Sequence, residues 1–154
     1  MKISRSALAT LATLALVGSL TGCTAGVSLE AAPDSNNPHC AEVSVRLPDQ
    51  IAGLDKRVTD AQATGAWGNP TSVILRCGLP AVEVSTLPCV TASGVDWLVD
   101  DSQKPSYRFV TFGRNPATEV IIDSNKVAGV TALDDLSTAI QSIEASKNCS
   151  AVTN

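Results

Sequence analysis

The chain is 154 residues long, 44% hydrophobic, 17% charged and only 3% aromatic, and its formal net charge is -4. This composition excludes most nucleic-acid-binding proteins, which carry a basic surface and aromatic side chains that stack on bases. One histidine leaves almost no material for a metal site built from histidines. We therefore expect one ordinary domain with no nucleic-acid partner, no metal and no cofactor.

Residues 1–22 have the pattern of an export signal. Lys2 and Arg5 form a short positive region, and Ala7 to Leu20 is a run of mostly small and apolar residues. These 14 residues are too few for a helix that spans a bilayer, which needs about 20. They suit the apolar segment of a secretory signal.

The signal ends in Leu20-Thr21-Gly22-Cys23, which resembles the lipobox of bacterial lipoproteins. In such proteins the cysteine is acylated, with palmitate among the added chains, and becomes the first residue after cleavage. We therefore expect Cys23 to anchor the protein to the outer face of the cytoplasmic membrane. The alternative is an ordinary secretory signal followed by an unrelated cysteine. Residues 23–39 are small, polar and without a period, which predicts a lipidated N-terminus on a flexible tether.

Residues 40–149 are the expected folded domain, and residues 150–154 form a short tail. The domain holds four cysteines, an even number in an exported chain, which predicts two disulfide bonds. They are Cys40, Cys77, Cys89 and Cys149. Spacing alone leaves all three pairings open. A thiol nucleophile or a metal set is the alternative, but the chain has no Cys-x-x-Cys pair.

Short runs of alternating apolar and polar residues predict a set of strands. The expected strands cover residues 42–47, 72–77, 89–92, 95–99, 107–112 and 119–123. Ser93-Gly94 and Gly113 to Pro116 are turn signals, so the last four strands form two hairpins. Residues 47–70 have prolines and glycines but no clear period, and we expect a long loop with room for one short helical turn.

The C-terminal part of the domain has helical rather than strand periodicity. Leu133, Leu136, Ile140 and Ile143 fall on one face of a helix. Thr131 and Asp134 match a capping box, and Lys147 suits the negative end of the helix dipole. The predicted fold is α+β: an antiparallel sheet of about five to six short strands, with this amphipathic helix packed on one face.

The sequence contains none of the common catalytic motifs. It lacks Gly-x-Ser-x-Gly, Ser-x-x-Lys, His-Glu-x-x-His and a phosphate-binding loop. His39 lies at the end of the expected tether, and Asp100-Asp101 reads as a solvated loop. We expect no catalytic residue; a carboxylate-dependent hydrolase of wall polymer is a less favoured alternative.

Two tryptophan segments stand out in a chain with so few aromatic residues: Ala66 to Pro70 and Gly94 to Trp97. The simpler interpretation is that Trp67 and Trp97 fill a small core. The alternative is a shallow groove with the two indoles as walls, in which Arg76 and Asp96 orient a polar ligand.

The same two segments, together with Val73-Ile74-Leu75-Arg76-Cys77-Gly78 between them, resemble the bacterial domain-of-unknown-function 3515 family. The resemblance covers roughly residues 40–146. It implies a small exported or lipid-anchored envelope protein of a Gram-positive bacterium, with no assigned activity. It also implies a Cys40–Cys77 bond, which leaves Cys89 to pair with Cys149.

The sequence therefore predicts a non-catalytic envelope lipoprotein that binds a partner protein or a wall component. A small-ligand or wall-component binding module at the Trp67 and Trp97 region is the alternative.

Overall fold

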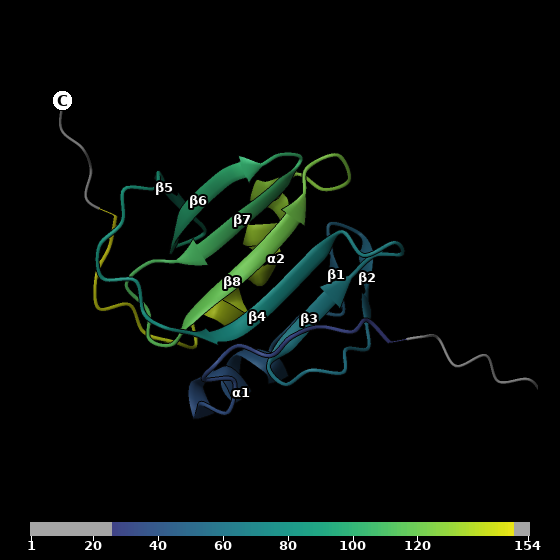
Figure 1. Cartoon of the computed structure of the whole chain (residues 1–154), viewed down its shortest axis with the longest axis horizontal. Helices are drawn as coiled ribbons and strands as arrows, with labels where there is room; N and C mark the ends of the chain where they lie inside the picture. Colours follow the sequence, from purple (N-terminus) through teal and green to yellow (C-terminus); the bar gives the residue numbers. More distant parts are fainter. Residues whose placement is uncertain (1–25, 150–154) are drawn as a thin grey trace, which may run out of the picture.

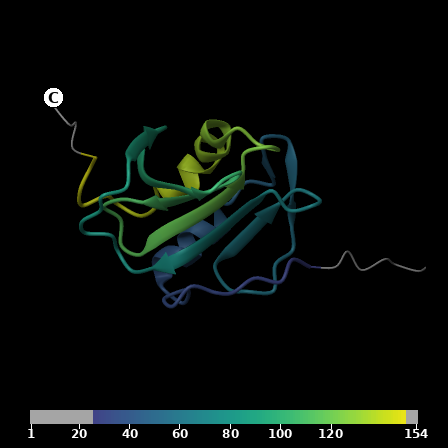
Figure 2. The same ribbon diagram turned by 45° about the horizontal axis from the view of Figure 1, so that its top comes forward.

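The structure is a computed structural model that describes residues 26–149. The expected signal peptide, the expected lipid-attachment residue Cys23 and the expected tail lie outside the described residues. Within the described range the chain forms one antiparallel sheet with two helices on the same face (Figure 1). Figure 2 shows the same arrangement from a turned view.

The helices are α1 (Pro38–Val45) and α2 (Gly129–Ile140). The strands are β1 (Gln50–Ile51), β2 (Leu54–Arg57), β3 (Thr64–Trp67), β4 (Val73–Leu79), β5 (Cys89–Ala92), β6 (Val95–Gln103), β7 (Ser106–Thr111) and β8 (Ala117–Asp123). Their order across the sheet is β1-β2-β3-β4-β8-β7-β6-β5.

The predicted antiparallel sheet and C-terminal helix are confirmed, as are the β5–β6 and β7–β8 pairs. The predicted number of strands is wrong, because the described chain forms eight rather than five to six. The difference lies mainly in residues 47–70, where the expected loop contains β1, β2 and β3. Each has at most four residues, and all four residues of β3 are buried. Such strands show no alternation for a sequence pattern to detect.

The predicted strand over residues 42–47 is also wrong, since α1 covers most of it. The Asn37 side chain accepts a hydrogen bond from the His39 amide at 3.0 Å, and Pro38 occupies the first turn. Asparagine before proline is a strong helix start, and here it outweighs a short alternating run. Val43 is buried against the core, whereas Val45 is 77% exposed.

α2 begins earlier than the sequence predicts. Ala128 occupies its N-cap position without a side-chain hydrogen bond, so the expected capping box of Thr131 and Asp134 is wrong. The Asp134 carboxylate instead accepts a hydrogen bond from Ser93 Oγ at 2.6 Å, in the β5–β6 turn. The buried side of α2 faces the sheet and includes Leu133 and Leu136.

The expected flexible tether is wrong for residues 26–39, which pack onto the domain. The Val27 amide donates to the Val58 carbonyl at 2.8 Å, and the Asp34 amide donates to the Gly78 carbonyl at 2.9 Å. Ala32 is buried. The sequence does not reveal this because the segment makes backbone contacts, which leave no side-chain periodicity.

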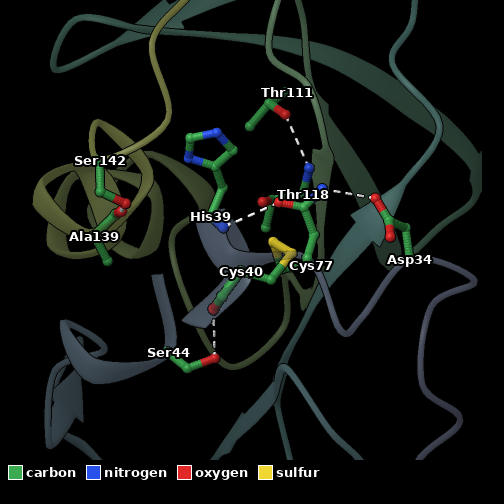
Figure 3. The surroundings of a disulfide bond; sticks show 10 residues. Asp34, His39, Cys40, Ser44, Cys77, Thr111, Thr118, Ala139 and Ser142 are labelled. Atoms are coloured by element: carbon green, nitrogen blue, oxygen red, sulfur yellow. Dashed lines mark hydrogen bonds between the residues drawn. A yellow bond between two sulfur atoms is a disulfide. The ribbon is translucent and has the colours of Figure 1, made fainter. Parts of the chain in front are cut away.

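Two disulfide bonds join distant parts of the chain. Cys40 of α1 bonds Cys77 of β4, with a Cα–Cα distance of 5.5 Å (Figure 3). Cys89 of β5 bonds Cys149 at the end of the described chain, with a Cα–Cα distance of 5.9 Å. Both pairings agree with those that the family resemblance implies.

The chain beyond α2 is held onto the β7–β8 turn. The Ser146 amide donates to the Gly113 carbonyl at 2.7 Å. The buried Arg114 guanidinium donates to the Ile143 carbonyl, and burial lowers the pKa of Arg114 below its ordinary value. Lys147 pairs with Glu83 in the β4–β5 loop and not with the end of α2, so its expected helix-end role is wrong.

The different burial of the two disulfides gives a test. Cys40 and Cys77 are fully buried, whereas Cys89 and Cys149 are half-buried. Since exchange needs access of a thiolate to a sulfur atom, a mild reductant acting on the folded protein should open Cys89–Cys149 first. Alkylation followed by peptide mass spectrometry measures the order. Loss of Cys40–Cys77 first would contradict the buried position of that bond.

The packing of the N-terminal segment gives a second test. Gly78 has φ +113°, and a Cβ added there would lie 2.5 Å from the backbone of Asp34. Gly53 also has a positive φ, of +78°, but a Cβ there would meet nothing within 4 Å. Gly53→Ala should therefore cost about 1 kcal/mol of stability in denaturant unfolding, from backbone strain alone. Gly78→Ala should cost clearly more, and equal losses would argue against the segment's position.

Candidate functional site

The two tryptophans belong to the core, so the predicted groove with indole walls is wrong. Trp67 and Trp97 are both 0% exposed. Trp67 lies in β3 and Trp97 in β6, with β4, β8 and β7 between those strands. They fill the layer between the sheet and the helices, which is the simpler of the two sequence interpretations.

The two indole nitrogens are in different situations. Trp67 Nε1 donates to the Pro48 carbonyl at 3.0 Å and so connects β3 to the start of β1. Trp97 Nε1 is buried and has no hydrogen-bond partner among the described residues.

Asp96 has a structural position near one edge of the sheet. Its carboxylate accepts hydrogen bonds from Thr91 Oγ1 at 2.5 Å and from the Cys149 amide at 2.6 Å. It therefore holds the β5–β6 hairpin to the C-terminal segment. Arg76 lies in β4 near the middle of the sheet, so the structure does not bring these two predicted site residues together.

The face of the sheet that carries no helix of the described chain is the candidate functional surface. In β4, Val73, Leu75 and Cys77 are buried, whereas Ile74 and Arg76 are half-buried and point to the other face. Strand register sets a row of neighbours across six strands on this face. In order, the row is Arg57, Ala66, Ile74, Ile121, Arg108 and Asp100. We call this row, with Arg76 and Glu119 beside it, the open face.

A charged triad occupies the middle of the open face. The Glu119 side chain is only 3% exposed and lies between Arg76 and Arg108. Arg76 Nε donates to Glu119 Oε2 at 2.7 Å, and Arg108 Nε donates to Oε1. The two arginine side chains are 28% and 39% exposed, so each presents part of its guanidinium to solvent. One carboxylate between two guanidinium groups leaves a net positive charge.

The rest of the row adds further polar groups at its two ends. Arg57 Nη1 donates to the Gly68 carbonyl at 3.1 Å. At the other end, hydrogen bonds from Ser102 lower the pKa of the Asp100 carboxyl, with a smaller contribution from Arg108. A hollow of about 200 Å³ lies there. It is lined by Asp100, Ser102, Gln103, Ser106, Arg108 and Ile121.

Arg76 is the only residue of this surface that the sequence singled out as a candidate binding residue. Alternation in the β7 and β8 segments would have put Arg108 and Glu119 on polar faces, but only the β4–β8 register brings Arg76 to Glu119. Asp100 is in β6, so the expected solvated loop at Asp100-Asp101 is wrong. His39 is exposed in the first turn of α1.

Residues 26–149 contain neither a cluster suited to a metal ion nor a helix suited to a membrane span. No group of three or more histidine, cysteine, aspartate or glutamate side chains in this range could hold a metal ion. No helix within it is long and apolar enough to span a membrane.

The family model described as "Protein of unknown function (DUF3515)" matches residues 6–149, nearly the whole chain. The chain belongs to this family. The resemblance found in the tryptophan segments is therefore confirmed, and the family's description assigns no function. Neither the curated proteins nor the solved structures include a significant match.

The unequal surroundings of the indoles allow a test of their core role in this DUF3515 domain. Trp67→Phe removes the hydrogen bond to the Pro48 carbonyl, while Trp97→Phe removes none. We expect Trp67→Phe to lower the free energy of unfolding by about 1 kcal/mol more than Trp97→Phe, measured by denaturant titration. A larger loss for Trp97→Phe would contradict the assigned positions.

Proposed function

We propose that the protein is a lipid-anchored, non-catalytic envelope protein whose open face binds a partner protein with an acidic surface. It acts at the outer face of the cytoplasmic membrane, with Cys23 as the lipid-attachment residue. The observation that carries this proposal is the open face itself: Ile74 and Ile121 at its centre, with Arg57, Arg76 and Arg108 around them.

The chemistry of this face fits a protein partner better than a small ligand. The centres of protein interfaces combine apolar side chains with arginines, which supply both packing area and directed hydrogen bonds. Ile74 and Ile121 are neighbours in register and both are half-buried, so a partner can complete their burial. A polar wall glycan would gain less from that apolar centre.

The charge of the face favours an acidic partner. The whole chain has a net charge of -4, yet the middle of the open face holds Arg76 and Arg108 against the single carboxylate of Glu119. Such local positive potential steers an acidic surface to this side of the molecule and away from the rest of it.

The state of the carboxylates supports a binding role over a hydrolytic one. An acid–base catalyst needs a carboxyl group that can exchange a proton with substrate. Glu119 is buried under two guanidinium groups, and Asp96 accepts two hydrogen bonds that hold the fold together. Both carboxylates therefore have a structural role, and neither is available for proton exchange with a substrate.

In-cell photo-crosslinking from the open face tests the proposal. A photoreactive amino acid at Ile121 should capture one envelope protein reproducibly, with the crosslinked peptide rich in Asp and Glu. The same residue at Val130, which is 67% exposed at the start of α2, should not capture it. Crosslinks to glycan only would favour a wall component, and equal capture from both positions would contradict a specific open face.

Crosslinking is preferable to removal of the arginines. Arg76→Gln or Arg108→Gln would leave Glu119 buried with one partner fewer, and the resulting instability would imitate lost binding. A substitution at Ile121 changes the surface and leaves all three charged members of the triad in the sequence.

A further inference from the structure

We propose that the domain lies directly against the lipid bilayer, and that one corner of it contacts the headgroups. This corner consists of residues 26–29, Lys56 and residues 58–60, and it is called the anchor corner below. The inference rests on the proposed lipid attachment at Cys23 and specifies how the attached domain is placed.

The anchor corner is a fixed part of the fold. Val27 forms a parallel bridge with Thr59, and the Asp60 amide donates to the Val27 carbonyl at 3.3 Å. The Leu29 amide donates to Asp60 Oδ1 at 2.9 Å, and this hydrogen bond is the main reason that the pKa of Asp60 is lowered. Figure 1 shows the described chain beginning beside the segment that follows β2. The point at which the chain enters the domain is therefore set by the fold.

The connection from this corner to Cys23 is short. Gly26 is three residues after Cys23, and three residues span at most about 11 Å even when fully extended. A tether over the whole of residues 23–39 would instead reach roughly 20–25 Å on average. A lipid on Cys23 thus holds the anchor corner within about 11 Å of the headgroups.

The side chains of the corner suit a lipid surface. Val58 is 72% exposed, and Lys56 beside it is also exposed. An apolar side chain next to a cation is the combination that binds at the boundary of anionic headgroups and acyl chains. The carboxylates of Asp55 and Asp60 are each hydrogen-bonded within the domain, to Gln50 and to Leu29.

This placement orients the open face. β2, which leads into Val58, is near one edge of the sheet, and β5 forms the opposite edge. The strands from β2 to β5 therefore lie progressively farther from the bilayer. The open face is then roughly upright beside the membrane, where a membrane-bound partner can reach it.

Fluorescence quenching in liposomes tests the contact. Trp67 and Trp97 are fully buried, so an added surface indole is distinguishable from them. Lipidated full-length protein carrying Val58→Trp should lose emission to lipids brominated near the headgroup. The matched control, Val84→Trp, replaces a valine that is 88% exposed in the β4–β5 loop and should not be quenched. Equal quenching of the two variants, or none at Val58→Trp, would overturn the placement.

Flotation of the wild-type lipoprotein with the same liposomes separates the two proposals. A protein that does not float contradicts the lipid anchor itself. A protein that floats while its Val58→Trp variant is not quenched contradicts only the contact of the anchor corner with the headgroups. Insertion of roughly a dozen Gly and Ser residues between Ala25 and Gly26 lengthens the reach and should abolish the quenching. Quenching that persists with this insertion would show that the short connection from Cys23 to Gly26 does not keep the anchor corner at the headgroups.

Discussion

The close approach of the N-terminal segment to β4 determines where α1 lies on the sheet and where the chain before it can run. Gly78 has a positive φ and no side chain, so the backbone of Asp34 can sit against it and donate to its carbonyl at 2.9 Å. One residue earlier, Cys77 bonds Cys40 of α1. Together these contacts hold residues 34–40 on the central strand. The Cys40–Cys77 bond fixes α1 against the sheet. The bridge between Val27 and Thr59 fixes the anchor corner separately.

The open face follows from that arrangement. Because α1 and α2 both cover the same side of the sheet, the other side must carry side chains that tolerate water. Several side chains on that side are nonetheless buried, among them Ala66, Leu98, Val110 and Glu119. Two arginines compensate the charge of Glu119. A buried ion pair contributes little net stability, because desolvation offsets much of the attraction. In the proposed binding role, the ion pairs hold two partly exposed guanidinium groups in place near Ile74 and Ile121.

The predictability of each part depends on how far apart its contacting residues are in the chain. The β5–β6 and β7–β8 pairs and α2 were predictable because their patterns are local and long enough to show a period. The three strands within residues 47–70 were not, since they are very short and β3 is buried throughout. The packing of residues 26–39 onto the domain could not be predicted from the sequence, because backbone hydrogen bonds hold that segment and leave no side-chain pattern. Arg76 was singled out from the sequence, but its partner Glu119 lies 43 positions away and required the β4–β8 register.

Both the proposed placement at the membrane and the proposed orientation of the open face depend on the ordered N-terminal segment. Hydrogen exchange of the folded protein tests it most directly. The amides of Val27, Asp34 and Cys40 donate to the carbonyls of Val58, Gly78 and Asn37, so all three should exchange far more slowly than in an unstructured peptide. If the amides of Val27 and Asp34 exchange at the rate of an unstructured peptide while Cys40 is protected, the segment before α1 is a long flexible tether after all. It would contradict both the fixed anchor corner and the proposed contact of that corner with the bilayer.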